Sequence, residues 1–304
     1  MKTSFPSPFK RWLAFAIWAL LSFLIFARPI YALIQLANRD DTYSYLLLIP
    51  FISAWLLFLD RKQPQVKLGF SVRPALLFLV ASLLAFFASL ECASCSAKDH
   101  LILQVLALIF LLVGGFLLIL GARKAKASSF ALAFLLFTVP IPDVILDKAI
   151  YGLRAGSAEI AEVLFNLSGV PVLREGFVFR LPKISIEVAQ ECSGIRSSLA
   201  LLILALLVAQ FSFRPLWKKL VFLLAGLCVM LVKNGIRIVS LTLLGNYVDP
   251  DFLYGNLHHR GGVVFFLIGL ALLLPLYWSL RKGETGTAGF GGQTVGGIGA
   301  AGNP

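Results

Sequence analysis

Polar motifs interrupt a strongly apolar sequence, and one of them contains a cysteine in a setting that favours a thiolate. Cys192 lies in the segment Glu191-Cys-Ser-Gly-Ile-Arg-Ser197, where a polar stretch becomes an apolar one. Unpaired N–H groups at the start of a helix stabilise a thiolate, and a nearby arginine such as Arg196 adds to the effect. Glu191 opposes it. On this chemistry alone, two interpretations of the segment are equally good. Cys192 is a nucleophile, or the segment is a helix cap, rich in glycine and serine such as Ser193, that happens to include a cysteine.

A second motif places a cation inside an apolar segment. Arg237 ends the motif Lys233-Asn234-Gly-Ile-Arg237, eighteen residues after Lys219. At about 1.5 Å per residue these eighteen residues span roughly 27 Å of helix, so Arg237 reaches the outer interface if Lys219 marks the inner one. An arginine within a span costs several kcal/mol unless it is paired or hydrated, which favours a functional cation over a snorkelling anchor.

A third motif supplies imidazoles. His258 and His259 lie in Leu257-His-His-Arg-Gly-Gly262, just before the last apolar segment. A lone histidine there would be an ordinary loop residue. Here, however, separate helix ends place a cysteine, an arginine and a histidine at one predicted depth, and these are the groups that acyl transfer requires. We therefore favour a catalytic site over coincidence.

The other cysteines are predicted to be structural. Cys228 lies within an apolar segment, where a thiol is expected to be an inert, buried packing residue. Cys92 and Cys95 form a Cys-x-x-Cys pair, for which redox or metal roles are conceivable. His100 is the only plausible further ligand nearby, and two cysteines do not make a metal site. A local disulfide or two free thiols is the favoured interpretation.

The composition requires a lipid environment. Of the 304 residues, 59% are hydrophobic and 14% are charged, against about 25% charged residues in soluble domains. The apolar residues occur in blocks near the length of about 20 residues that crosses a bilayer. We therefore predict an all-α polytopic membrane protein with about eight transmembrane helices, at about 12–36, 43–60, 74–91, 101–121, 127–142, 192–212, 217–244 and 261–280.

The first block is predicted to be a retained span. It begins at Trp12 and continues to Ala27 without a convincing small-x-small cleavage site, so a cleaved secretory signal is rejected. The net charge of +12 would suggest nucleic acid in a soluble protein. In a membrane protein, basic residues that collect in cytoplasmic loops explain it, and we expect lipid and no nucleic acid as a partner.

The distribution of charge predicts the orientation. With the N-terminus inside, the inner segments hold Lys2, Lys10, Arg11, Arg61, Lys62, Lys67, Arg73, Arg123, Lys124, Lys126, Arg214, Lys218, Lys219, Arg281 and Lys282, and only two acidic residues, Asp60 and Glu284. The outer segments hold Asp40, Asp41, Asp99, Asp143, Glu159, Glu175, Asp249 and Asp251. This positive-inside pattern places both termini in the cytoplasm and the three motifs at the outer face.

The longest outer loop, 143–190, should contain two kinds of structure. Its first part, 144–167, has apolar residues at helical spacing between charged ones, which predicts an amphipathic interfacial helix. Its second part, 170–188, alternates apolar and polar residues around a turn at Glu175-Gly176, which predicts short strands. We expect one membrane-embedded domain, 1–282, followed by a disordered glycine-rich tail, 283–304.

At these motifs the chain resembles the exosortase/archaeosortase family of membrane cysteine transpeptidases. The most specific segments are Glu191-Cys-Ser-Gly-Ile-Arg-Ser197, Asn234-Gly-Ile-Arg237 and the His-x-x-Gly-Gly of 258–262. Pro140-Ile-Pro142 and the segment 169–176 are also similar to the family. The resemblance covers the chain from the first spans to about Trp278.

The resemblance implies a catalytic set and a class of substrate. By motif, Cys192 is the nucleophile, Arg237 the essential cation and His258 the acid/base, with His259, Arg196, Asn234, Glu191 and Ser193 as supporting candidates. No cofactor or metal is implied. The implied substrates are secreted proteins with a C-terminal sorting signal: a short motif such as Pro-Glu-Pro (PEP-CTERM-like), a hydrophobic helix and a basic cluster. The implied location is the bacterial inner membrane, and the acceptor is not specified.

Three alternatives stay open at the level of the sequence. A membrane cysteine protease that only hydrolyses its substrate shares the first half-reaction with a transpeptidase. An anion transporter would use Arg237 and Arg196 to bind its substrate, but the sequence has no convincing repeat of the kind many transporters show. A membrane scaffold without catalysis would be insensitive to thiol alkylation.

Overall fold

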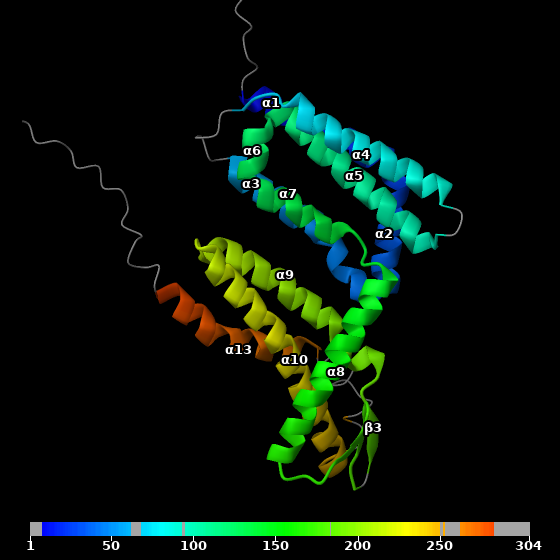
Figure 1. The fold of residues 1–304 in the computed structure, drawn as a ribbon, viewed down its shortest axis with the longest axis vertical. Helices are drawn as coiled ribbons and strands as arrows, with labels where there is room; N and C mark the ends of the chain where they lie inside the picture. Colours follow the sequence, from blue (N-terminus) through cyan, green and yellow to red (C-terminus); the bar gives the residue numbers. More distant parts are fainter. Residues whose placement is uncertain are drawn as a thin grey trace, which may run out of the picture. The chain divides into compact units, whose positions relative to one another are not determined.

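The structure is a computed structural model, which describes residues 8–61, 68–92, 95–182, 184–249, 252 and 262–282. The side chains of Glu191 and Cys192 and the predicted tail, 283–304, lie outside the described part of the chain. The chain divides into two compact units, Met1–Ala149 and Ile150–Pro304 (Figure 1). Each unit is described separately below.

The predicted fold class is confirmed. Within the described ranges, seven helical segments are long and apolar enough to cross a membrane, and a bent pair of helices brings the number to eight if it counts as one span. The seven are Pro8–Ile25 (α1), Asp41–Arg61 (η1 and α3), Val72–Glu91 (α4), Ala97–Leu120 (α5), Ile195–Ser212 (α9), Leu216–Tyr247 (α10) and Gly262–Lys282 (α13).

The first predicted span, 12–36, is wrong as a single helix. The chain forms α1, which ends at Ile25, and a separate helix α2, Ala27–Arg39. Pro29 has no N–H to donate to the carbonyl of Ile25, so the helical ladder is interrupted at this point. A related change occurs in the second span, where the 3-10 helix η1, Asp41–Leu47, precedes α3, Ile49–Arg61. Pro50 has no N–H to donate to the carbonyl of Leu46, which interrupts the helical hydrogen bonds of this segment.

The fifth predicted span, 127–142, is wrong as one helix that crosses the bilayer. It consists of α6, Ala122–Ala127, α7, Ser129–Phe134, and the 3-10 helix η2, Leu135–Thr138. The next helix, α8, Asp143–Leu167, departs from Ser129–Thr138 at 91°. Pro140 and Pro142 cause the break, because neither can donate a helical hydrogen bond and each disfavours helix in the residue before it.

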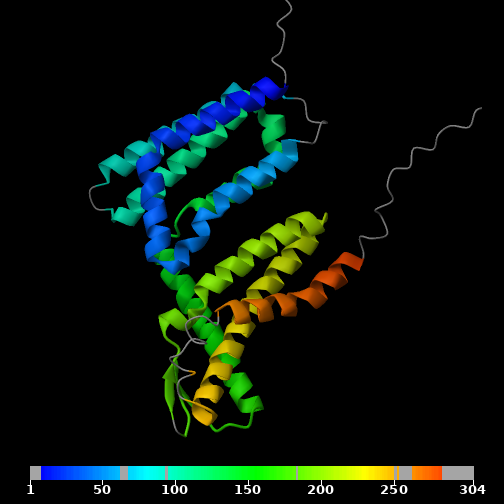
Figure 2. The ribbon, with the colours of Figure 1, turned by 180° about the vertical axis from the view of Figure 1, so that it is seen from behind.

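In the first unit, α5 lies between two partners. Helix α4 packs along one side of it and α1 along another (Figure 2). The Ser82 hydroxyl of α4 donates to the carbonyl of Ala107 at 2.7 Å, and the Trp18 indole of α1 donates to the carbonyl of Leu111 at 3.1 Å. A Cβ atom on Gly115 would lie 2.1 Å from Trp18 Nε1, so the indole ring fits only against a glycine.

A small polar cluster fastens the end of this unit where α8 begins. The Lys98 ammonium pairs with the Asp143 carboxylate at 2.5 Å and also donates to the Tyr43 hydroxyl. Tyr43 is buried, and its hydroxyl donates to the carbonyl of Ile141 at 3.3 Å. The start of α5, the start of η1 and the proline turn before α8 are therefore held together.

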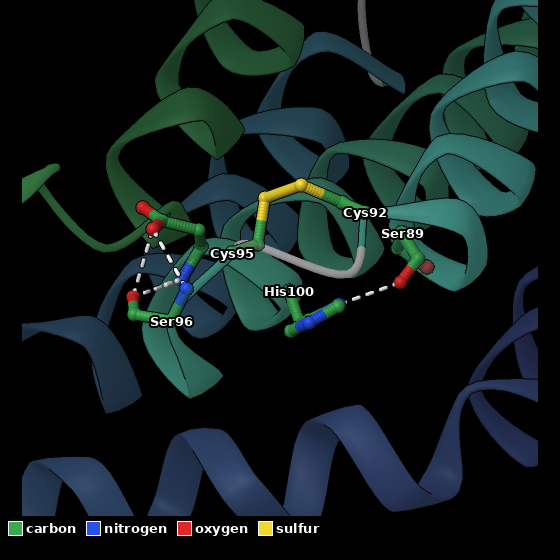
Figure 3. The surroundings of a disulfide bond; sticks show 6 residues. Ser89, Cys92, Cys95, Ser96 and His100 are labelled. Atoms are coloured by element: carbon green, nitrogen blue, oxygen red, sulfur yellow. Dashed lines mark hydrogen bonds between the residues drawn. A yellow bond between two sulfur atoms is a disulfide. The ribbon is translucent and has the colours of Figure 1, made fainter.

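A disulfide between Cys92 and Cys95 closes the turn that joins α4 to α5 (Figure 3). Ser96 caps α5 with its hydroxyl and exchanges hydrogen bonds with Asp99 in a capping box. The His100 ring lies on the other side of the turn, with Nδ1 2.6 Å from the carbonyl oxygen of Ser89. Of the two favoured interpretations, a local disulfide or two free thiols, the structure has the disulfide, and the bonded sulfurs and engaged imidazole disfavour the metal alternative.

Cys228 differs from its prediction. We expected a buried packing residue, but its thiol is exposed on the surface of α10. Within a span such a surface faces lipid. The hydrophobic pattern could not distinguish the two faces, because the neighbours of Cys228 are apolar on both.

The second unit contains the small sheet that the sequence predicts. Three antiparallel strands, β1 Leu173–Glu175, β2 Val178–Arg180 and β3 Ser185–Glu187, pair in the order β1-β2-β3. Phe179 lies opposite Arg174 and Ile186 in the register. Gly176 has φ +63° in the turn between β1 and β2, a conformation that glycine adopts without a steric cost.

Ion pairs and a shared core attach this sheet to α8. Arg174 donates to Glu162 at 2.6 Å and to Glu159 at 2.8 Å, and the hydrogen bond to Glu159 is the main cause of a raised pKa of Arg174. Arg154 Nε donates to the carbonyl of Val188 at 2.8 Å. The apolar contacts between α8, the sheet and α10 are made by Ala158, Ala161, Phe165, Phe179, Leu181, Val188, Ile238 and Val239.

Helix α10 is the longest of the described elements and contacts α8, α9 and α13. Its 32 residues extend about 48 Å, more than the hydrocarbon core of about 30 Å. Its first part packs against α9 and α13, around Leu201, Phe222 and Leu273. Its C-terminal part continues beside α8 and the sheet (Figure 1).

Replacing Cys92 and Cys95 by serine should cause a small loss of stability. The disulfide closes a loop of four residues, and chain-entropy reasoning gives it about 2 kcal/mol at most. In a unit of this size that corresponds to a fall in Tm of about 4–8 °C. Thermal unfolding in detergent, with Cys228→Ser as the control that removes the lipid-facing thiol, measures it. A fall of well over about 10 °C would contradict a purely local role.

Candidate active site

The turn before α9 contains the candidate nucleophile. The 3-10 turn η3, Gln190–Ser193, includes the backbone of Cys192, and α9 begins two residues after it at Ile195. Gly194 separates them with φ +68°, a left-handed conformation that permits the sharp change of direction. The buried Ser193 hydroxyl accepts a hydrogen bond from the N–H of Ile195 at 3.4 Å. The cysteine therefore precedes a helix N-terminus, as the sequence predicts.

Gly194 lies directly against α10. A Cβ atom at this position would be 2.7 Å from Asn234 Oδ1 and 3.1 Å from Asn234 Cγ, so only a glycine permits the approach. Asn234 is buried and also donates through Nδ2 to the Ser157 hydroxyl of α8 at 3.0 Å. One amide side chain thus contacts the cysteine turn on one side and α8 on the other.

A second contact, one residue earlier on α10, joins α10 to the first turn of α9, which directly follows the cysteine turn. The Lys233 ammonium donates to the Ser197 hydroxyl, in the first turn of α9, at 2.6 Å. Ser197 in turn donates to the carbonyl of Gly194 at 3.1 Å. Lys233 is 1% exposed, and a Cβ on Gly269 of α13 would lie 3.2 Å from its Cδ atom. The lysine is therefore enclosed by α9, α10 and α13.

Arg237 lies one turn beyond Lys233 on α10. Residues four apart share a helix face, so the two cations lie along one side of α10, with Arg237 nearer its C-terminus and half-buried. Between them, Gly235 faces α8, where a Cβ atom would lie 2.5 Å from Ile160 Cγ2. Tight packing on α8 therefore fixes the rotation of α10 and with it the face that carries Arg237.

The structure brings together only part of the predicted set. The turn of Glu191 and Cys192 and the residues Ser193 and Asn234 meet at the contact between η3 and α10, and Arg237 follows on the same helix. Arg196 is exposed on the first turn of α9. His258 and His259 lie outside the described residues, so their positions relative to Cys192 stay a prediction.

Three polar residues at this contact were given no role in the sequence prediction: Lys233, Ser197 and Ser157. Lys233 had a usable signal, because the rule that singles out Arg237, a charge inside an apolar span, applies equally to it. The two serines had none, since hydroxyls are common in spans and only the packing of α8 and α9 against α10 brings them into contact.

Within the described ranges, no group of three or more His, Cys, Asp or Glu side chains could hold a metal ion. The arrangement instead combines a cysteine turn at a helix N-terminus with buried and half-buried cations on the facing helix. These features stabilise anions, and in particular a thiolate or an oxyanion.

Comparison with known proteins assigns this architecture to a family. The family model described as transmembrane exosortase matches residues 36–275, which are 240 of the 304 residues. The matched range contains the η3 turn, the Lys233 to Arg237 segment and both histidines. Neither the curated proteins nor the solved structures contain a match to the chain.

Substituting Gly194 by alanine should destabilise the second unit more than the same change at Gly176. Both glycines have a positive φ, +68° and +63°, which costs an alanine about 1–2 kcal/mol. At Gly176 nothing lies within 4 Å of the added Cβ, whereas at Gly194 the Cβ would overlap Asn234. Overpacking adds about 1–3 kcal/mol. Thermal unfolding of the two variants measures the difference, and equal Tm values would show that the contact is not tight.

Proposed function

Because the chain belongs to the transmembrane exosortase family, we propose that it is a membrane-embedded cysteine transpeptidase with Cys192 as the nucleophile. Membership supports a multi-pass membrane transpeptidase or protease of the exosortase type, which processes secreted proteins that carry sorting signals. The finer proposal is that the enzyme cleaves C-terminal, PEP-CTERM-like signals through a thioester intermediate and transfers the protein to an acceptor.

The contact between Gly194 and Asn234 is the observation that carries this proposal. It holds the turn that contains Cys192 against the helix that contains Arg237, although 45 residues of sequence separate the two side chains. A reaction between a thiol and a peptide carbonyl requires the nucleophile and its cation to be held within a narrow range of distances. A rigid contact between buried groups supplies that constraint better than a mobile loop would.

The proposed reaction has two half-reactions. The Cys192 thiolate attacks the scissile carbonyl, and Arg237 stabilises the oxyanion by charge-assisted hydrogen bonds. As the C–N bond breaks, the His258 imidazolium gives its proton to the leaving amine, and a thioester remains. An acceptor amine then attacks the thioester and gives up its proton to His258, and the carbon–sulfur bond breaks to regenerate the thiolate. With water as the acceptor, the product is a free carboxylate.

The distribution of charge suggests how a substrate would be presented. We place both termini in the cytoplasm and the site at the outer face of the bacterial inner membrane, because the predicted inner segments are rich in basic residues and hold only Asp60 and Glu284 as acidic ones. A substrate tail with a hydrophobic helix and a basic end would insert with its basic end inside. Its scissile peptide would then lie at the outer interface, at the depth proposed for Cys192.

Changing the proposed residues one at a time should separate their roles. In membranes that contain a tagged substrate, Cys192→Ala should abolish processing because no other group forms the thioester. Arg237→Gln should slow it by about 100- to 1,000-fold, the effect of losing an oxyanion donor. His258→Ala should abolish it, and His259→Ala should not. Gel mobility of the tagged substrate provides the measurement.

Cys228→Ser is the matched control, because it removes a lipid-facing thiol from α10 and should leave processing unchanged. Normal processing by Cys192→Ala would refute the nucleophile. If His259→Ala loses processing and His258→Ala processes normally, His259 is the acid/base, and the other assignments are unchanged. Mass spectrometry of the new C-terminus distinguishes a transferred group from a free carboxylate, and thus transpeptidation from hydrolysis.

A further inference from the structure

Lys233 is a buried cation to which the proposed reaction assigns no role. An ammonium group has three donors, and the hydrogen bond of Lys233 to Ser197 uses one of them. None of the ion pairs between described residues involves this lysine. A charge enclosed by helices in a membrane is destabilising unless a negative charge lies close to it. An anion close to Lys233 would therefore stabilise its charged form.

The carboxylates that the described helices and strands of the second unit carry around this corner already have partners. Glu159 and Glu162 pair with Arg174, Glu175 pairs with Arg180, and Glu187 pairs with Arg154. On α13 the charged residues, Arg281 and Lys282, are at the far end from Gly269. Asp147 and Lys148 lie on α8 about ten residues before Ser157, which is about 15 Å of helix away. The other charged or titratable residues of the packed elements are Tyr151 on α8, Arg196 on α9, Tyr277 on α13, Lys218, Lys219, Cys228, Arg237 and Tyr247 on α10, and Glu191 and Cys192 in η3. The cations cannot supply a negative charge, so the anion that would stabilise a charged Lys233 is sought in η3.

The chain itself keeps η3 near Lys233. Gly194 contacts Asn234, the neighbour of Lys233, and Cys192 precedes Gly194 by only two residues. Since consecutive Cα atoms are about 3.8 Å apart, the Cα atom of Cys192 lies within about 8 Å of that of Gly194, and the backbone of the turn is therefore on the order of 10 Å from Lys233. With an effective dielectric constant of about 20, a unit charge at that distance shifts a titration by about one pH unit.

We infer that Lys233 is a positioning residue that keeps the Cys192 thiol in its thiolate form and, through Ser197, holds the first turn of α9 in place behind it. This inference rests on the proposed function, because it concerns the same nucleophile. Its basis is the burial of Lys233, its hydrogen bond to Ser197 and the contact that ties the cysteine turn to the adjacent residue. The field of Lys233 adds to that of Arg237 and of the α9 N-terminus.

The hydrogen bonds argue against the other chemistry that a serine and a lysine can perform together. In a Ser–Lys pair the lysine must accept the serine proton. Here the Ser197 hydroxyl has one proton, which it donates to the carbonyl of Gly194 at 3.1 Å, while Lys233 donates to the serine oxygen. In this arrangement Ser197 accepts from Lys233 and its own proton is directed away from the lysine, toward Gly194.

The test is the pH dependence of alkylation at Cys192. Iodoacetamide is applied to the purified full-length chain carrying Cys228→Ser, in which the Cys92–Cys95 disulfide stays intact. The midpoint of the rate against pH should lie below the ordinary thiol value of about 8.5. Lys233→Met should raise the midpoint by about one pH unit, and Lys233→Arg should restore it. Lys219→Met, at the other end of α10, should leave it unchanged.

Lys233→Met should fold, because replacing a buried charge by an apolar side chain of similar length is often neutral or stabilising. Its Tm in detergent checks this. Should Lys233→Met not fold, Lys233→Arg and Ser197→Ala still test the inference, because the first keeps the charge and the second removes only the hydrogen bond. The difference in alkylation midpoint between the chain with Lys233 and the Lys233→Met variant should persist when both also carry Glu191→Gln. Its disappearance there would overturn the inference by making Glu191 the partner of the lysine.

Failure of this inference can be distinguished from failure of the proposed function. An unchanged midpoint in folded Lys233→Met, together with loss of substrate processing in Cys192→Ala, would overturn the role of Lys233 alone. Normal processing by Cys192→Ala would refute the nucleophile, and with it the role of Lys233, whatever the alkylation profile. Processing that survives Cys192→Ala and is lost in Ser197→Ala would assign the reaction to the serine–lysine pair and overturn both.

Discussion

Close packing along α10 is the constraint on which the second unit depends. In lipid, helices gain little from hydrophobic association with one another, so their contact depends on how closely the surfaces approach. Glycines provide this approach on several sides of α10. Gly235 admits Ile160 of α8, Gly156 of α8 admits Leu231, and Gly269 of α13 admits the stem of Lys233. A methyl group at Gly235 would overlap Ile160 and force α10 away from α8, and Arg237 would move with it, whereas at Gly156 or Gly269 the side chain of Leu231 or Lys233 would have to shift.

Polar side chains fix the register that the glycines permit. Asn234 bonds to Ser157 of α8 and Lys233 bonds to Ser197 of α9, from adjacent positions on α10. Buried polar groups are costly without partners, so sliding either helix along α10 would leave an amide or an ammonium without its hydroxyl. Tight apolar contact therefore sets the distances, and these hydrogen bonds set the alignment. The distance and the alignment of the cysteine turn are fixed in the same way, because Gly194 contacts the same asparagine.

How much of this the sequence could predict depends on whether a feature is local. Apolar blocks and turn residues are local, and they predicted the fold class, the sheet around Gly176 and the helix start after Cys192. Windowed hydrophobicity hid the breaks that Pro29 and Pro50 impose on the chain. The local sequence does not determine how a helix in lipid is rotated about its axis, since both of its faces are apolar. This is why the exposed face of Cys228 and the contact of Lys233 with Ser197 required the structure, and why the role of His258 stays a prediction.

The cysteine turn is anchored at both ends, and the two anchors come from different kinds of structure. On its N-terminal side, Arg154 of α8 holds the carbonyl of Val188, two residues before η3 begins. On its C-terminal side, Gly194 lies against Asn234, which itself bonds to α8 through Ser157. A short turn with both ends held to α8, directly or through one side chain, has little freedom to change its shape. The sheet thus contributes to the position of the site, because the ion pairs of Arg174 hold β1 to α8 and β3, the strand that leads into the turn, pairs with β2 beside β1.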